Sequence, residues 1–161
     1  MMKTEFDTIR ELYRYNSAVR KKYLRAIWKL PPRQRYKSRG ASFPSLVDIY
    51  MHVLDAYRWW FISVYRNGKT FDEYPLSQRY TKSEAERETD AVDRLLQKVL
   101  REVGPRGLSR ILRWRGRRPF RVSVRNMLLH MVEEELQHRG EMNALLWQID
   151  VDPPVTGFDE R

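Results

Sequence analysis

The chain has 161 residues, 42% of them hydrophobic, which is enough for one domain with a hydrophobic core of its own. It has no cysteine, which excludes disulfides, thiolate metal ligands and a cysteine nucleophile, so any metal must be bound by nitrogen and oxygen atoms. The N-terminal residues carry charge where a signal peptide needs an apolar segment, and no stretch reaches the length of a membrane helix. We therefore expect one domain over residues 1–161 of a soluble, cytoplasmic protein with no membrane partner.

The net charge of +10 is distributed unevenly along the chain. Residues 12–47 contain ten Lys and Arg and no acid, and residues 106–125 contain eight Arg and no acid. The remaining residues include 13 bases and 21 acids, so most of the chain is acidic. The charge therefore indicates a polyanion partner only at these two basic segments.

The first predicted helix begins at the capping pair Thr4 and Asp7 and ends before the two prolines at 31 and 32. Between them, residues of one face recur at steps of three and four: Phe6, Ile9, Tyr13, Asn16, Val19, Tyr23, Ile27 and Leu30. A polar, basic loop is expected over residues 33–41. Asn16 is expected to be a buried amide with a hydrogen-bond partner on another helix.

The second predicted helix follows the segment SFPS at residues 42–45, which supplies a capping hydroxyl and a first-turn proline. It runs to Tyr65, and Asn67 and Gly68 end it. It is apolar on nearly all sides, so we expect it to be the most buried element. His52, its single imidazole, is then a polar group in an apolar environment, where it needs a partner.

The third predicted helix begins at a capping box of Ser83 and Glu86 and ends at Gly104 and Pro105. The segment RILRWRGRRPFRVS, residues 110–123, alternates apolar and basic residues around a glycine and predicts a short hairpin. The last helix is expected from residue 122 or 123 to Ile149. Together these elements predict an all-α four-helix bundle with a small hairpin or irregular segment before the last helix.

The last predicted helix carries the groups most suited to chemistry. On a helical wheel His138 lies within the apolar arc, Glu134 lies one turn before it toward the edge of that arc, and His130 lies further out, at a rim. A carboxylate and an imidazole at i and i+4 can bind one metal ion, and His52 on the other buried helix is the natural third ligand. Two imidazoles and a carboxylate suit Zn, Ni, Fe or Mn and leave positions open for water and substrate.

Two neighbouring glutamates give alternatives to this ligand set. Glu133 and Glu135 are expected on a solvated face, although Glu135 is close enough to the inner arc to replace Glu134 as the ligand. Glu135 and His138 also have the Glu-x-x-His spacing of di-iron bundles, which require the motif twice. The chain contains this motif once, which does not meet the requirement of a di-iron bundle.

Three segments resemble the DinB-like family of four-helix metalloproteins, which includes thiol-dependent transferases. They are YRYNSAVRKKYLRAIWKLP, SFPSLVDIYMHVLDAYRWWF and LLHMVEEELQHRGEMNALLWQIDVDPP, and they span most of the chain. The third is the most specific, because its histidines at four-residue spacing end in His-Arg-Gly before a leucine-rich tail and prolines. The second has a seryl cap, an apolar run, a histidine and then an aromatic pair.

The resemblance implies an up-down-down-up bundle, often a homodimer, with one metal-binding histidine on the second helix and two on the last. The matching positions are His52, Glu134 and His138, with a glutamate where a histidine is usual, and His130 matches a further family histidine that can act as an additional ligand. A divalent transition metal follows as the cofactor, Zn or Ni before Fe or Mn, with a small-molecule or thiol substrate. The implied activity is that of a metal-dependent S-transferase or hydrolase, and no separate catalytic residue is identified.

Two other functions remain open. In the first, the arginine-rich hairpin and residues 12–47 bind DNA or RNA, with Trp114 and Phe120 stacking on bases while the arginines contact phosphates. The competing structural interpretation packs these aromatics onto the bundle and pairs the arginines with the acidic third helix. In the second, the chain is a non-catalytic interaction bundle.

Overall fold

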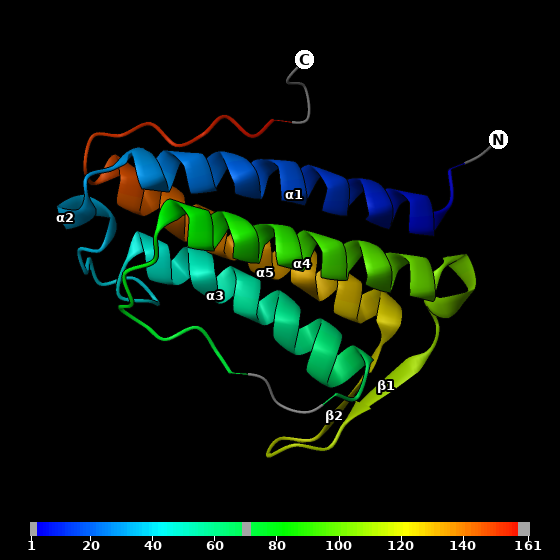
Figure 1. The fold of residues 1–161 in the computed structure, drawn as a ribbon. Coiled ribbons are helices and arrows are strands. Elements are labelled where there is room, and N and C mark those ends of the chain that lie inside the picture. The colour runs from blue at the N-terminus through cyan, green and yellow to red at the C-terminus, as the bar shows by residue number, and fades with distance from the viewer. Residues whose placement is uncertain (1–2, 69–71, 158–161) are drawn as a thin grey trace.

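The computed structural model describes residues 3–68 and 72–157 and is mostly helical (Figure 1). The helices are α1 (Glu5–Lys29), α2 (Pro32–Arg35), α3 (Leu46–Arg58), the π-helix η1 (Trp59–Tyr65), α4 (Lys82–Val103), the 3-10 turn η2 (Pro105–Gly107) and α5 (Val124–Trp147). Two short strands, β1 (Ile111–Trp114) and β2 (Phe120–Ser123), lie between η2 and α5. The prediction of a helical protein with a small hairpin before the last helix is confirmed.

The helix starts confirm some predicted caps and correct others. Thr4 caps α1 together with Asp7, as predicted. The cap of α3 is Ser45, whose hydroxyl accepts from the Asp48 N–H, so the proline at 44 precedes the helix instead of lying in its first turn. The predicted box of Ser83 and Glu86 was wrong, because the pair two residues earlier, Thr81 and Glu84, makes both reciprocal hydrogen bonds.

The C-terminal part of the second predicted helix differs from a regular α-helix. From Trp59 to Tyr65 it widens into a π-helix, which spacing of apolar residues does not reveal. Gly68 ends this segment, and its N–H donates to the Ile62 carbonyl. A Cβ at this position would lie 2.7 Å from that oxygen, so the close approach requires glycine. The predicted loop after residue 32 also contains a short helix, α2.

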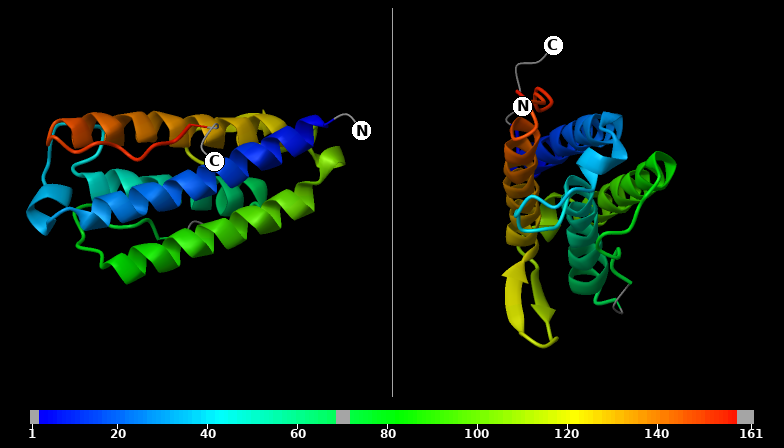
Figure 2. Two further views of the ribbon diagram at one scale, coloured as in Figure 1. Left: turned by 90° about the horizontal axis from the view of Figure 1, so that it is seen from above. Right: turned by 90° about the vertical axis from the view of Figure 1, so that its left-hand side faces the viewer.

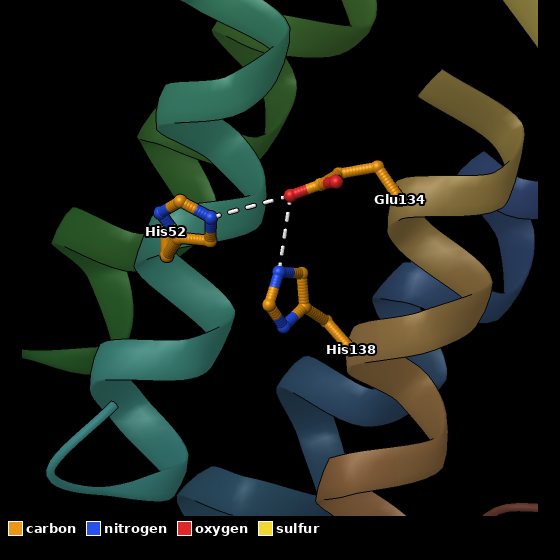
Figure 3. A group of neighbouring side chains, drawn as sticks. All are labelled: His52, Glu134 and His138. Atoms are coloured by element: carbon orange, nitrogen blue, oxygen red, sulfur yellow. Dashed lines mark hydrogen bonds and ion pairs between the residues drawn. The ribbon is translucent and has the colours of Figure 1, made fainter. Parts of the chain in front are cut away.

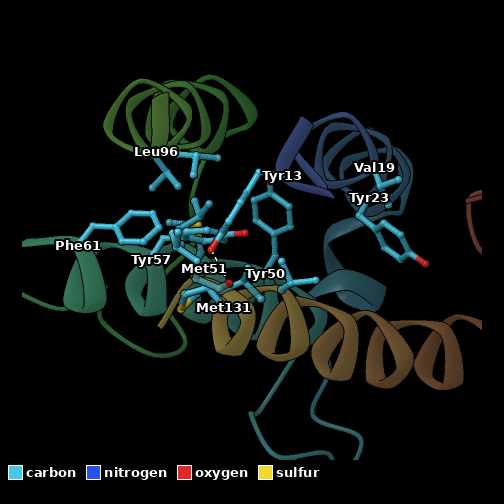
Figure 4. Close-up of a cluster of buried hydrophobic side chains, with 14 of the residues drawn as sticks. Tyr13, Val19, Tyr23, Tyr50, Met51, Tyr57, Phe61, Leu96 and Met131 are labelled. Carbon is cyan, nitrogen blue, oxygen red and sulfur yellow. Dashed lines mark hydrogen bonds between the residues drawn. The ribbon is translucent and has the colours of Figure 1, made fainter. Parts of the chain in front are cut away.

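The four long helical segments pack along one another (Figures 1 and 2). Their apolar faces meet in one core, where large side chains such as Tyr13, Tyr57, Phe61, Leu96 and Met131 converge (Figure 4). Tyr57 packs edge-on against both Tyr13 and Phe61, with ring centroids 6.2 Å and 5.6 Å apart. Within residues 3–68 and 72–157, no helix combines the length and the apolar character needed to cross a membrane.

Strands β1 and β2 form an antiparallel hairpin that extends away from the bundle (Figures 1 and 2). The register pairs Leu112 with Val122 and Trp114 with Phe120 on the inner face. Ser123, the last strand residue, also caps α5, because its hydroxyl accepts from the Asn126 N–H. The hairpin therefore leads directly into the helix that carries Glu134 and His138.

Candidate metal centre

His52 lies in the middle of α3 and is partly exposed. The ring of Phe43, from the segment before the helix, stacks on the imidazole with centroids 4.0 Å apart and planes 26° apart. This stacking restricts the ring orientation from one side. The sequence placed His52 on a buried helix, and the structure shows that its ring reaches the edge of a cavity.

Glu134 and His138 lie one turn apart on α5 and face His52 (Figure 3). The Nε2 atom of His138 is 3.1 Å from Glu134 Oε1, and the Nε2 atom of His52 is 3.3 Å from the same oxygen. The two imidazole rings meet edge-on with centroids 4.8 Å apart. One ligand atom from each residue lies within 4.8 Å of the other two, so α3 and α5 bring three potential donors to a common point.

The two separations from Glu134 Oε1 fit a single metal ion, and a nitrogen of each imidazole lies within 4.8 Å of one on the other ring. In a tetrahedral centre with metal–ligand bonds of about 2.1 Å, two ligand atoms are separated by about 3.4 Å. The distances from Glu134 Oε1 to the two nitrogens match this value within a few tenths of an ångström. Two nitrogens and one carboxylate oxygen are also a donor set that divalent transition metals accept.

A second carboxylate, Glu141, orients His138 from behind. Its Oε2 atom is 2.7 Å from His138 Nδ1 and also accepts a 2.7 Å hydrogen bond from the Ser42 hydroxyl. When Nδ1–H donates to Glu141, Nε2 of the neutral ring carries a lone pair directed at the donor cluster. Glu141 was not predicted from the sequence, although its spacing of three residues from His138 places both on the same side of the helix.

The charges of the cluster depend on one another. Hydrogen bonds from His138 and then His52 lower the pKa of Glu134 well below its usual range, so this group is a carboxylate. Burial opposes protonation of His138, but Glu134 and Glu141 outweigh it and raise the pKa of the ring. Burial likewise opposes ionisation of Glu141, yet the Ser42 and His138 hydrogen bonds lower its pKa.

The cluster opens onto a cavity of about 360 Å³. His52 and Glu134 form part of its wall, and Trp59 and Trp60 form another part. His130 lies at the same cavity with 43% of its side chain exposed, next to the Trp60 ring and 3.6 Å from Glu133. The cavity gives a small molecule access to the donor cluster, while His138 is buried behind it.

Glu135 was expected either on a solvated face or as a metal ligand in place of Glu134, and both expectations were wrong. It is only 3% exposed and points into the core, where Arg20 and the Tyr57 hydroxyl contact its Oε2 at 2.7 Å and 2.6 Å. It is therefore turned away from His138, and the di-iron motif does not form a site. Arg139 is also buried, and it donates to Asn16 Oδ1 at 3.0 Å, which confirms a cross-helix partner for this amide.

The sequence was also compared with known proteins and protein families. No curated protein matches the chain. The model of the DinB family matches residues 1–160, which is nearly the whole sequence. The match therefore includes both helices that carry the donor cluster. The chain belongs to the DinB family.

Proposed function

We propose that this protein binds a divalent transition metal through His52, Glu134 and His138 and uses it in a metal-dependent reaction. The observation that carries the proposal is the approach of two imidazole Nε2 atoms to one carboxylate oxygen at a cavity wall. The donor set favours Zn or Ni, with Fe or Mn as alternatives.

A metal in such a site lowers the pKa of a bound thiol or water and provides a nucleophile at neutral pH. The protein contributes the orientation of its ligands: Glu141 fixes His138, and Phe43 fixes His52. The cavity of about 360 Å³ provides room for a small substrate beside the ligands. The chain has no cysteine, so a thiol must come from a small-molecule substrate. The reaction class we propose is S-transfer to or from such a thiol, or hydrolysis.

The glutamate at position 134 affects which metal the site prefers. A carboxylate is a harder ligand than imidazole and adds one negative charge to the site. It also keeps that charge without a metal, because both histidines stabilise the ionised form. We therefore expect Glu134→His to keep metal binding and to shift preference away from Fe and Mn toward Zn and Ni.

Metal content tests the proposal directly. Untagged wild-type protein should contain about one equivalent of metal per chain, and His52→Ala and His138→Ala should each lose most of it. His130→Ala is a matched control, because this histidine lies on α5 but is exposed. The metal should also stabilise the wild type by about 2.7 kcal/mol at a concentration one hundred times its Kd. Equal metal content in all four proteins would exclude the site, and absence of metal even after Zn or Ni addition would favour a non-catalytic bundle.

The family resemblance also supports an up-down-down-up order and a homodimer. The colour gradient of Figure 1 supports that order, since α3 and α4 run in one direction and α1 and α5 in the other. Light scattering on the purified protein tests the homodimer, and a monomer mass would exclude it.

A further inference from the structure

The hairpin carries positive charge that no acid among residues 3–68 and 72–157 neutralises through an ion pair. Its five arginines, called the hairpin arginines below, are all exposed: Arg113, Arg115, Arg117, Arg118 and Arg121. In the part of the chain that the structure describes, none of them has an ion-pair partner. The expected pairing with acids of α4 does not occur there, and Glu102 near the end of that helix pairs with Arg66 instead.

The strand register increases the repulsion among these charges. Arg113 lies directly opposite Arg121 on the exposed face of the hairpin. Like charges at paired positions of an antiparallel ladder destabilise it. The turn between the strands adds three more arginines and contains no acid. This arrangement opposes hairpin stability in isolation, and an anionic partner would relieve the repulsion.

The hairpin aromatics are occupied by contacts with the bundle. The Trp114 ring lies 5.4 Å from Trp59, and the Phe120 ring lies 5.5 Å from Trp60. The turn also folds over Trp114, because a Cβ at Gly116 would lie 2.5 Å from its indole. Base stacking requires an aromatic face that is free to receive a base. The structure therefore argues against the expected stacking of Trp114 and Phe120 on nucleic acid and leaves the guanidinium groups as the available contacts.

We propose that the hairpin arginines contact the phosphate backbone of double-stranded nucleic acid. A guanidinium group matches phosphate oxygens with two parallel hydrogen bonds, and a two-stranded ribbon fits the major groove of B-form DNA. An anionic membrane fits less well, because the tip at residues 115–119 has no large apolar side chain to insert between lipids, and its one apolar residue is Pro119. Binding is independent of base sequence, since the contacts are to phosphates.

Fluorescence anisotropy with a labelled duplex of arbitrary sequence tests this surface. The logarithm of the association constant should fall linearly with the logarithm of NaCl concentration between about 50 and 200 mM, with a slope near −0.9 for each phosphate contacted. The triple variant Arg115→Gln, Arg117→Gln, Arg118→Gln should bind about tenfold or more weakly at the lowest salt and reduce the slope by about 2.7.

A matched control distinguishes binding by the hairpin arginines from binding that depends only on the net charge of the protein. Arg14, Arg25 and Lys29 are exposed on α1 within the other basic segment, and changing all three to Gln removes the same total charge. This control should keep most of the affinity and slope. A further variant, Arg121→Glu, places an acid opposite Arg113 and should raise the melting temperature while weakening duplex binding. That combination excludes loss of folding as the reason for weaker binding.

Four outcomes would overturn the proposal: no measurable duplex binding, equal weakening by the α1 control, tighter binding to single strands that depends on Trp114, or binding to phosphatidylserine vesicles without duplex binding. The metal site has no ligand in the hairpin, so each of these outcomes leaves the metal measurements unaffected.

Discussion

Two adjacent glutamates on α5 have opposite environments. The side chain of Glu134 is 21% exposed and lines the cavity, and its Oε1 atom contacts the Nε2 atoms of His52 and His138. Glu135 is 3% exposed and lies in the core between Arg20, Tyr57 and Arg139. One residue of helix turns the side chain by about 100°, which is enough to separate an accessible cluster from an inaccessible one.

The two environments use carboxylate charge differently. Around Glu135 the arginines are permanent cations: burial alone would lower the pKa of Arg20, but Glu135, Tyr57 and Asp93 hold it well above its usual range. Around Glu134 the partners are imidazoles, which exchange a proton or a metal near neutral pH. The buried ion pair of Arg20 and Glu135 therefore stabilises the packing of α1 against α5. The cluster of His52, Glu134 and His138 can instead bind either protons or a metal ion.

The largest expected effect comes from removing the buried charge. Glu135→Gln keeps the size of the side chain but leaves Arg20 with Asp93 as its remaining acidic partner. Breaking a buried ion pair costs about 3 to 5 kcal/mol when the remaining charge is left unpaired. Because Asp93 still pairs with Arg20, the free energy of unfolding should fall by about 3 kcal/mol, the lower end of this range. Urea denaturation of metal-free protein measures this change.

Glu134→Gln is the matched control, with the same substitution one residue earlier. In metal-free protein it should cost less than about 1 kcal/mol, because the side chain is partly solvated. If both variants lost the same free energy of unfolding, the contrast between the two glutamates would be wrong.

A smaller effect is expected from Glu141, which contacts the cluster only through His138. Glu141→Gln retains an oxygen that can accept from His138 Nδ1–H but removes the negative charge. Loss of such an outer partner weakens metal binding by about 10-fold, or about 1.4 kcal/mol. Competition with a chromophoric chelator measures the Kd without relying on an activity.

Ser42→Ala provides a graded comparison, since Ser42 touches Glu141 and is one contact further from the metal ligands. Its effect on the Kd should be smaller than that of Glu141→Gln. A Kd for Glu141→Gln equal to that of the wild type, while His138→Ala loses metal, would leave the metal site intact and remove the role of Glu141.

Much of the fold was predictable because periodicity and helix-ending residues are local signals. The ends of α1 and α4 follow from the prolines at 31 and 105, and the hairpin follows from alternation around Gly116. The π-helix η1 was not predictable, since its apolar residues are compatible with an ordinary helix. The cap of α4 was misplaced because Ser83 and Thr81 offer the same chemistry two residues apart.

The candidate site was predictable where it depends on one helix and less so where it depends on packing. The wheel placed Glu134 and His138 together, and His52 followed from the requirement for a third donor. Glu135 was misjudged because its partner Arg20 is 115 residues away in sequence. Nothing in the local pattern around residue 135 indicates a buried arginine on another helix.

The smallest expected effect is a pH dependence that distinguishes the two environments. In the metal-free protein the pKa of His138 is raised above its unfolded value, so protonating this ring stabilises the fold. That contribution is fully present below the unfolded pKa of about 6.5 and is lost as pH rises through the folded pKa. The lowered pKa of Glu134 acts at the acidic side: its contribution is present above the unfolded pKa of about 4.3 and is lost at lower pH.

The urea midpoint of metal-free protein should therefore decrease modestly from about pH 6 to 8, as the imidazole loses its proton. His138→Gln should flatten this decrease, because it removes the titrating group. His130→Gln should preserve it, since that residue lies at the exposed rim. A slope that survives in His138→Gln would mean that another group controls the pH dependence and that His138 is not held by its two carboxylates.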